Sequence, residues 1–357
     1  MLRPILWAAN RFASRPVRAR IFEALDELLA SSLHDPGKKG LLINFTEKRE
    51  RVIIFSDQHK GARDGADDFT MAEPNYLAAL DYYDLNDYCL IALGDSEELW
   101  ENSLSKVREK NEKTFEAEKR FVQRKSFAKV IGNHDLYWGN DPLAPWQLKN
   151  IYGRDMKVYE GVMISTMVDD RPFRIFCTHG HQGDAQSDGN WFSKFFISRI
   201  WAPLQAYLRI NPNTPAYDNE KKTLHNEIMY EWSAAQKDII LVTGHTHQPV
   251  FASLTHIERL YKDFQFASSR NDAAELARVR DEIVKREKEF TAVALDYLTM
   301  RPSYFNSGCC CFSDGDITGI EIVEGSIRLV KWEMIDEKPQ RTLLEEMTLA
   351  ELMNRLA

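Results

Sequence analysis

The 357-residue sequence lacks the patterns that mark several classes of protein. It has only five cysteines, and none of them has the CxxC spacing that is typical of zinc fingers and redox motifs. We therefore interpret them as reduced, mostly buried thiols in a cytoplasmic protein. No apolar run approaches the roughly 18 residues of a membrane-spanning helix. Internal repeats and low-complexity tracts are missing as well.

Basic residues are fewer than acidic residues. Lysine and arginine number 46 against 54 aspartates and glutamates, which gives a formal net charge of −8. A nucleic-acid-binding protein usually has a basic surface, so we do not expect nucleic acid as a partner. The acidic balance is compatible with a phosphorylated small molecule as substrate, because bound metal ions can supply local positive charge.

The N-terminus reverses this balance, because residues 1–20 contain five arginines and no acidic residue. Its apolar core, ILWAA, ends at Asn10 and Arg11, which does not fit a signal peptide. Three interpretations remain: a transit peptide, a basic amphipathic helix in peripheral contact with a membrane through residues 1–30, and a helix docked on the main domain. We favour the docked helix and treat residues 1–40 as one N-terminal helical segment.

Residues 41–335 have the pattern of one α/β domain, because short apolar segments alternate with loops and helical segments. Two highly charged segments with a helical rhythm, at about residues 100–125 and 256–292, are expected to be helical insertions. A solvated helix face explains such charge runs. A partner-binding helical hairpin is the alternative for the second segment.

The C-terminal part of the sequence predicts a hairpin followed by a helix. The stretch ITGIEIVEGSIRLVKWE alternates between apolar and polar residues on both sides of Glu324 and Gly325. This alternation predicts two antiparallel strands joined by a tight turn. A helix is expected over residues 336–357.

Five apolar segments each end in polar residues. They are RVIIFSDQH, YCLIALGD, FAKVIGNHD, FRIFCTHGH and DIILVTGHTH. Ligands of α/β proteins bind beyond the carboxyl ends of strands, so we expect these five ends to converge. Six of the nine histidines lie in them. A lone buried histidine is more often a core residue, but six beside carboxylates indicate a catalytic centre for Mn, Fe or Zn.

The order Asp-x-His, Gly-Asp, Gly-Asn-His-Asp, His and Gly-His-x-His resembles that of the calcineurin-like metallophosphoesterases, roughly over residues 51–332. The resemblance implies two packed mixed β-sheets, a sandwich flanked by helices. It also implies a centre of two divalent metal ions, for which we favour Mn. The implied ligands are Asp57, His59 and His247 for one ion, Asn133, His179 and His245 for the other, and Asp95 as a bridge.

The implied reaction is hydrolysis of a phosphate ester or pyrophosphate bond by a hydroxide that bridges the two metals. His134 would face the leaving group as proton donor or as stabiliser of developing charge. Asp135 would orient His134 and favour its protonated form. Further residues could contact substrate or support the ligands, with plain surface charge as the alternative for the basic ones; they are His181, Asp184, Glu98, Lys60 and Arg63.

Two features bear on the substrate. Glu98, three residues after Asp95, and Trp100 resemble the UDP-2,3-diacylglucosamine diphosphatase branch, although that branch tends to carry Arg where this chain has His134. Residues 191–201 form an aromatic stripe, which is either a core helix, the interpretation we favour, or the wall of an apolar cleft. With the basic N-terminus, these features favour an amphiphilic phosphate or pyrophosphate. The alternatives are a nuclease or phosphodiesterase of the same fold and a non-catalytic metal-binding interaction module.

Overall fold

The computed structural model describes residues 16–45, 51–64, 67–183, 219–270, 272–286 and 300–356. Asp184, the aromatic stripe at 191–201 and most of the basic N-terminus lie outside the described residues, as does the end of the second charged segment. Among the helices that are described, none is long and apolar enough to cross a membrane.

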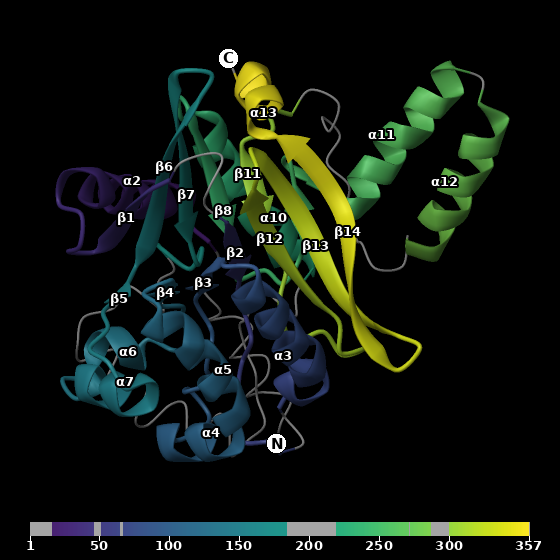
Figure 1. The fold of residues 1–357 in the computed structure, drawn as a ribbon. Helices are drawn as coiled ribbons and strands as arrows, with labels where there is room; N and C mark the ends of the chain where they lie inside the picture. The colour runs from purple at the N-terminus through teal and green to yellow at the C-terminus, as the bar shows by residue number, and fades with distance from the viewer. Residues whose placement is uncertain are drawn as a thin grey trace, which may run out of the picture.

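Two mixed sheets of seven strands form the body of the molecule (Figure 1). The first has the order β1-β6-β7-β8-β11-β9-β10. Its strands are β1 (Gly40–Asn44), β6 (Gly161–Val168), β7 (Arg171–Thr178), β8 (Ile239–Thr243), β9 (Val250–Phe251), β10 (Leu254–Thr255) and β11 (Tyr304–Asn306). The second has the order β14-β13-β12-β2-β3-β4-β5. Its strands are β2 (Val52–Phe55), β3 (Cys89–Leu93), β4 (Phe127–Val130), β5 (Val158–Tyr159), β12 (Ile317–Val323), β13 (Ser326–Ile335) and β14 (Lys338–Thr348).

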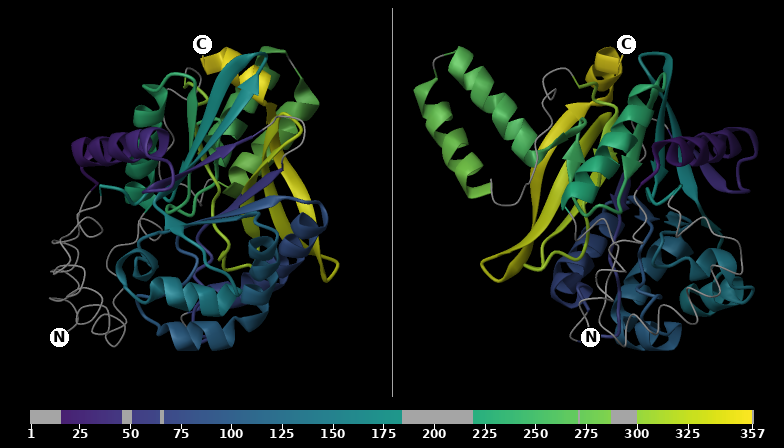
Figure 2. Two further views of the ribbon diagram at one scale, coloured as in Figure 1. Left: turned by 60° about the vertical axis from the view of Figure 1, so that its left-hand side comes forward. Right: turned by 180° about the vertical axis from the view of Figure 1, so that it is seen from behind.

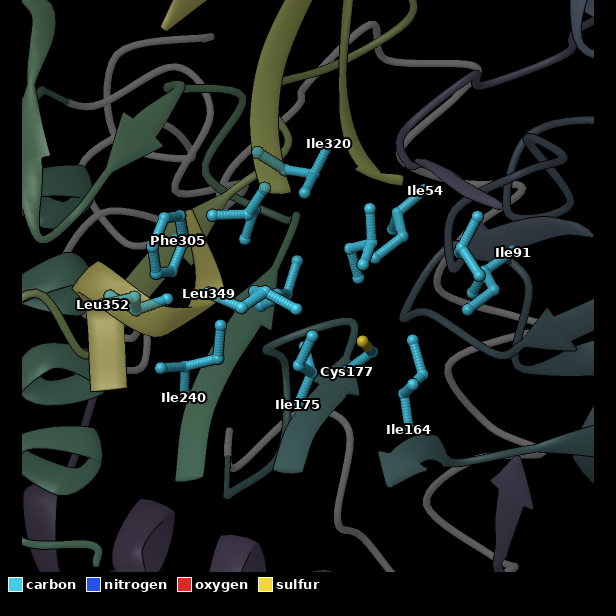
Figure 3. Close-up of a cluster of buried hydrophobic side chains, with 14 of the residues drawn as sticks. Ile54, Ile91, Ile164, Ile175, Cys177, Ile240, Phe305, Ile320, Leu349 and Leu352 are labelled. Carbon is cyan, nitrogen blue, oxygen red and sulfur yellow. The ribbon is translucent and has the colours of Figure 1, made fainter. Parts of the chain in front are cut away.

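The main hydrophobic core lies between the two sheets. Ile54 and Ile91 of the second sheet face Ile175 and Ile240 of the first, as Figure 3 shows. Leu349, on the C-terminal helix α13 (Leu349–Leu356), packs into the same core. Because helices cover the outer faces as well, strands such as β2 are buried on both sides. Their sequences are therefore continuous runs of apolar residues.

Helices cover both outer faces. Beside the second sheet lie α3 (Phe69–Leu85), α4 (Leu104–Lys110), α5 (Glu112–Gln123), α6 (Tyr137–Asn140) and α7 (Ala144–Tyr152). Beside the first lie α2 (Arg18–His34) and α10 (Asn219–Ala234). The predicted sandwich of two mixed sheets between helices is thereby confirmed. The charged segment at 100–125 forms α4 and α5.

A helical hairpin projects from this body (Figure 2). It consists of α11 (His256–Ser269) and α12 (Ala273–Arg286), which occupy the described part of the second charged segment. A reciprocal capping box between Thr255 and Glu258 starts α11. The two helices share a small core of their own, made by Ile257, Leu260, Val279 and Ile283.

The C-terminal region differs from the prediction. The two strands around Glu324 and Gly325 are present as β12 and β13, and both turn residues have positive φ. The helix expected over 336–357 is confined to α13, because β14 extends the sheet through residues 338–348. β14 pairs with β13 along its whole length. This pairing overrides the helical preference of the sequence LLEEM.

Candidate metal centre

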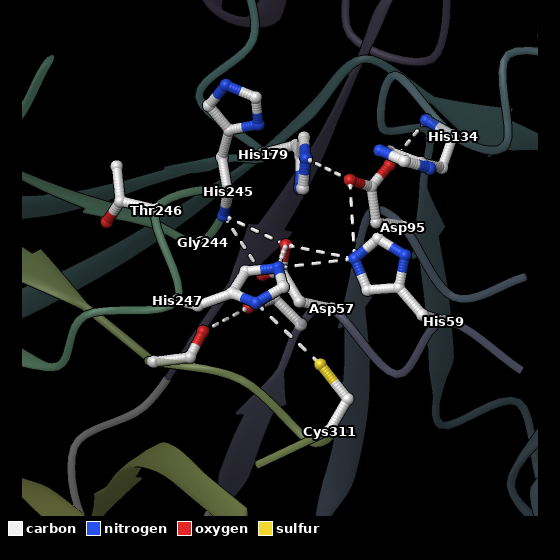
Figure 4. Close-up of polar contacts among 12 residues, drawn as sticks. Asp57, His59, Asp95, His134, His179, Gly244, His245, Thr246, His247 and Cys311 are labelled. Atoms are coloured by element: carbon white, nitrogen blue, oxygen red, sulfur yellow. Dashed lines mark hydrogen bonds and ion pairs between the residues drawn. The ribbon is translucent and has the colours of Figure 1, made fainter. Parts of the chain in front are cut away.

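The polar residues at the five strand ends meet at one end of the two sheets (Figure 4). β2, β3 and β4 are parallel neighbours in the second sheet, so the segments that follow them reach one edge. β7 and β8 are parallel neighbours in the first sheet and do the same. The structure thus brings together the side chains that the sequence predicts as metal ligands: Asp57, His59, Asp95, Asn133, His179, His245 and His247. All are buried except His247, whose side chain is 17% exposed.

The backbone at these strand ends is strained. Positive φ is uncommon outside glycine. Five of the seven predicted ligands nevertheless have φ between 49° and 69°: Asp57, His59, Asp95, His245 and His247. Such conformations cost about 1–3 kcal/mol each and persist where the surrounding structure imposes them, often at functional sites. The fold therefore holds these side chains in positions that local preference disfavours.

Two glycines allow the ligand loops to approach each other closely. A Cβ on Gly132 would lie 2.8 Å from Cγ of Asp95 and even closer to its Oδ1 and backbone nitrogen. A Cβ on Gly94 would lie 2.5 Å from the ring of His179, and Gly94 has a φ of 86°. Each glycine directly precedes a predicted ligand, so the loops can meet only without side chains at these two positions.

The first cluster of ligand atoms lies between the loops after β2 and β8. Nε2 of His247 is 3.2 Å from Oδ1 of Asp57 and 3.2 Å from Nε2 of His59. Nε2 of His59 is also 3.9 Å from Oδ2 of Asp95. One ligand atom each from Asp57, His59 and Asp95 lies within 4.8 Å of the others, which is a spacing that one cation can span.

The second cluster shares Asp95 with the first. Nε2 of His179 is 3.0 Å from Oδ2 of Asp95 and 3.2 Å from Oδ1 of Asn133. Ligand atoms of Asp95, His179 and His245 again lie within 4.8 Å of one another. Because Asp95 belongs to both groups and a carboxylate has two oxygens, it is the natural bridge between two cations.

The hydrogen bonds outside the two clusters show that the ligands fit metal ions. Nδ1 of His59 faces the carboxylate of Glu98 at 3.1 Å, and Nδ1 of His179 donates to the carbonyl of Leu93 at 2.9 Å. These partners only accept hydrogen bonds, so each Nδ1 carries a proton and Nε2 is the ring atom that can bind a metal ion. Nε2 of each ring faces oxygen or nitrogen atoms of the other predicted ligands. A cation shared by these atoms fits this arrangement.

The electrostatics of the clusters favour the same conclusion. Burial by itself would lower the pKa of His179, but the carboxylates of Asp95 and Asp57 outweigh it and raise that pKa to about 9. Burial would raise the pKa of Asp95, but the histidines around it hold this pKa well below its usual value. The carboxylates thus draw positive charge to the ring nitrogens.

His245 differs from the other histidines of the site. Burial, reinforced by the neighbouring rings of His225 and His179, lowers its pKa well below the usual value. Its imidazole is therefore neutral, which is the form that binds metal. The backbone N–H of His245 donates to the carboxylate of Asp57 at 2.9 Å, which ties the loop after β8 to the loop after β2.

His134 lies beside the two clusters, and its Nδ1 contacts Glu98. Oε2 of Glu98 is 2.6 Å from this nitrogen and also faces His59. Burial would lower the pKa of His134, but Glu98 and Asp95 raise it to about 9. The ring of Trp100 stacks on that of His134 at a centroid distance of 4.4 Å. Nε2 of His134 is buried without a hydrogen-bond partner among the described residues. That nitrogen is therefore available to a bound molecule.

The role predicted for Asp135 is wrong in one respect, because Glu98 and not Asp135 contacts the His134 ring. The carboxylate of Asp135 accepts from the backbone N–H groups of Gly132 at 2.6 Å and Ser96 at 2.9 Å. Asp135 thus stabilises the turn that carries His134 and joins it to the loop after β3.

Lys60 does not reach the centre as a substrate contact and is not surface charge either. Its side chain is fully buried and pairs with Glu118 at 2.6 Å and with Glu97 at 3.1 Å. In the sequence, Lys60 directly follows a polar motif after a strand and therefore resembles an exposed loop residue. The acidic partners that bury it come from α5 and from the segment after β3.

The remaining predicted residues are placed as follows. Arg63 pairs with Glu73 at the start of α3, on the surface. His181 is buried, and its ring centroid lies 5.4 Å from that of His179. Asp184 lies outside the described residues. Of these three, only His181 is thus described beside a predicted ligand.

Two residues next to the ligands were not singled out by the sequence. His225, on α10, lies with its ring centroid 5.1 Å from that of His245, and its Nε2 donates to the carbonyl of Gly180 at 2.8 Å. Sγ of Cys311 is 3.7 Å from Nδ1 of His247. No local pattern around His225 marks it. Cys311 is the last of three consecutive cysteines near the end of the domain, which is a weak signal.

Fold and site together define an α/β sandwich protein with candidate metal ligands at the carboxyl ends of its strands. The sequence profile described as calcineurin-like phosphoesterase matches residues 50–249, which is more than half of the chain. The protein therefore belongs to the calcineurin-like phosphoesterase family, as the order of its motifs predicted. This family binds divalent metals. A comparison with curated proteins gives no match.

Several solved structures resemble the chain weakly. Vacuolar protein sorting 29 from Cryptosporidium parvum has 12% identity and a TM-score of 0.32, with 84% of this chain and 98% of that chain covered. Wild-type Vps29 from Entamoeba histolytica, complexed with Zn²⁺, has 12% identity, a TM-score of 0.30 and coverages of 82% and 98%. A dimetal phosphatase from Danio rerio has 8% identity, a TM-score of 0.36 and coverages of 85% and 99%. At these TM-scores the similarities carry no functional inference.

Proposed function

We propose that the protein is a phosphoesterase that uses two divalent metal ions, with Mn²⁺ favoured, to hydrolyse a phosphate ester or pyrophosphate bond. One observation carries the proposal. Two groups of buried ligand atoms converge around the shared carboxylate of Asp95, beside Nε2 of His134, which has no hydrogen-bond partner among the described residues. Binding of metal alone needs the first feature, whereas transfer of a proton to a leaving group needs the second.

The ligands divide between two positions. Asp57, His59 and His247 would hold one ion, and Asn133, His179 and His245 the other, with Asp95 common to both. Two divalent ions held by these residues would supply charge that neutralises phosphate oxygens and brings the pKa of a water molecule to about neutral. The strained strand ends hold the ligands in place before any ion arrives, which reduces the reorganisation that binding requires.

His134 has the properties of a general acid. Glu98 occupies its Nδ1, so the proton available for transfer is on Nε2. The raised pKa keeps the imidazole protonated near neutral pH, which is the state needed to protonate a departing oxygen. Trp100 packs against one face of the ring and thereby fixes its plane.

Trp100 also supports an inference about the leaving group. Its side chain is partly exposed while one face covers His134. A leaving group that approaches Nε2 of His134 therefore passes an aromatic surface. This surface favours a leaving group with a flat or apolar face, as in an aryl, nucleotide or lipid-linked phosphate.

The proposal is tested by metal-dependent hydrolysis with three substrates. Purified protein is freed of metal, reloaded with Mn²⁺, and assayed with p-nitrophenyl phosphate, bis-p-nitrophenyl phosphate and a UDP-linked sugar. We expect hydrolysis of at least one of them, and its complete loss with a chelator. The preferred compound then assigns a monoester, a diester or a pyrophosphate as the substrate class.

Two histidine variants give a matched comparison. His134→Asn should lower kcat about 10²–10⁴-fold without changing metal content, because it removes the proton donor. His34→Asn makes the same substitution at an exposed position at the end of α2 and should leave kcat unchanged. Protein that binds two Mn²⁺ ions yet hydrolyses none of the three compounds would overturn the proposal in favour of a metal-binding interaction module.

A further inference from the structure

Two lysines and two glutamates form a buried cluster next to the loops of the candidate metal centre. Lys60 and Glu97 follow β2 and β3, Glu118 lies on α5, and Lys129 lies on β4. Each of the four residues is at most 1% exposed. Lysine and glutamate are almost never fully buried unless they are paired, so four of them in one place require an explanation.

The four charges compensate one another. Nζ of Lys60 lies 2.6 Å from Oε1 of Glu118 and 3.1 Å from Oε1 of Glu97. Nζ of Lys129 lies 2.9 Å from Oε2 of Glu97. The cluster is therefore a chain of ion pairs, Glu118–Lys60–Glu97–Lys129, without net charge.

Uncharged donors complete the hydrogen bonding of the two carboxylates. Nε1 of Trp138, on α6, donates to Glu97 at 2.6 Å. The hydroxyl groups of Tyr152 and Tyr76, on α7 and α3, donate to Glu118 at 2.7 and 3.2 Å. Since these directional contacts involve four helices, two strand-end segments and strand β4, they define the position of each participant.

The cluster is connected directly to the loops of the centre. Lys60 follows His59, and Glu97 precedes Glu98. The N–H of Lys60 donates to the carbonyl of Ser96, and the N–H of Glu98 donates to the carbonyl of Lys60, both at 3.1 Å. The two loops therefore remain paired beyond the ends of β2 and β3. A displacement of the buried ion pairs would displace Glu98.

Stability alone does not explain this arrangement. Moving ions out of water is costly, and apolar residues of similar volume are often as stabilising as a buried ion pair or more so. Ion pairs differ from apolar packing in that they fix direction as well as distance. A fixed direction and distance matter most for Glu98, because one of its carboxylate oxygens contacts both His59 and His134.

We propose that Lys60, Glu97, Glu118 and Lys129 form a positioning network that holds Glu98 where its carboxylate contacts His59 and His134. The inference rests on the proposed hydrolytic function and extends it to residues that contact neither metal nor substrate. Disruption of the network with the fold intact should lower turnover and loosen the loop after β3. Substrate binding should change little, because none of the four residues reaches the centre.

The test is the double variant Lys60→Met/Glu118→Gln. It removes one positive and one negative charge, leaves Glu97 paired with Lys129, and keeps one acceptor oxygen at position 118 for one of the two tyrosines. The matched control is Lys119→Met/Glu116→Gln, which makes the same substitutions at a solvent-accessible pair, 2.9 Å apart, on the same helix. Thermal unfolding, Mn²⁺ stoichiometry by calorimetry and amide hydrogen exchange in residues 95–100 are measured for both variants. Steady-state kinetics on the preferred ester then give kcat and KM.

We expect the buried double variant to fold, to bind Mn²⁺, and to lose about 10–100-fold in kcat at nearly unchanged KM. Amide hydrogen exchange in residues 95–100 should become faster in this variant. The control should match the wild type in kcat and in amide exchange. A folded variant with wild-type kcat and exchange would overturn the proposal. If the double variant does not fold, Glu118→Gln alone makes the same comparison. If the wild type hydrolyses nothing, the proposed function fails, and the exchange measurement still decides the network.

Discussion

Replacing Gly132 with alanine should displace the carboxylate that the two ligand clusters share. The added Cβ would lie 2.8 Å from Cγ of Asp95, and closer still to its backbone nitrogen. Ordinary contact between carbon atoms is roughly 3.5–4.0 Å, so a relative shift of about 1 Å is required. Rotation of the Asp95 side chain cannot relieve the contact with the backbone. The loop after β3 must therefore move away from the turn that carries His134.

The magnitude follows from two effects. Overpacking of a rigid site costs about 1–3 kcal/mol of the free energy of unfolding. A misplacement of about 1 Å at catalytic groups lowers turnover about 10²-fold. The same shift stretches the 2.7 Å hydrogen bond from the N–H of His134 to Oδ1 of Asp95. We therefore expect weaker Mn²⁺ binding together with the loss in kcat.

The assay compares Gly132→Ala with Gly139→Ala, seven residues further along the chain. A Cβ at Gly139 would meet only the flexible end of Ile131, and this position lies in the short helix α6, where alanine is the better helix former. Mn²⁺ affinity by calorimetry, unfolding by urea and kcat are measured for both. If Gly132→Ala keeps the metal affinity and kcat of the wild type, the close approach of the two loops does not position Asp95 and the reasoning fails.

Three further outcomes are expected. Removing metal with a chelator should lower the thermal midpoint, because each ion at about 100 times its Kd contributes roughly 2.7 kcal/mol; identical calorimetric scans with and without Mn²⁺ would contradict a metal centre. Glu98→Gln should lower kcat about 10–100-fold, because the Glu98 carboxylate contacts both His59 and His134. The control Glu101→Gln, at an exposed position, should leave kcat unchanged. Equal steady-state rates for the two variants would show that Glu98 has no role in the mechanism. Lys60→Met alone should cost about 3–5 kcal/mol in urea unfolding, because it leaves a buried carboxylate uncompensated, against at most about 1 kcal/mol for Lys119→Met; a small loss for Lys60→Met would show that water or a proton compensates the charge.

Much of the fold could be predicted from the sequence, because the apolar segments and the motifs that follow them are local signals. Each of the five strand ends combines an apolar run with polar residues, and the order of the five is specific to one family. The failure at residues 338–348 has a physical cause. The segment is charged and has helical preference, and only its long pairing with β13 makes it a strand. Pairing of this kind depends on the rest of the fold.

The candidate ligands were predictable for the same reason, since a residue at a strand end is placed by the strand. The partners of the ligands were not. Glu98 and Asp135 each stand next to the motifs, and both could have been assigned to the ring of His134. The choice between them depends on which way each side chain leaves its turn, and the turns have backbone angles that no sequence pattern specifies.

Lys60 shows the limit most clearly. A lysine directly after a loop histidine is exposed in most proteins, and nothing near it in the sequence suggests otherwise. Its two carboxylate partners are 37 and 58 positions away, on a strand-end loop and on a helix that packs across the sheet. Burial of a charge is a property of the assembled layers. Residues held in place by such contacts are therefore found in the structure, whereas the candidate metal ligands are already visible in the sequence.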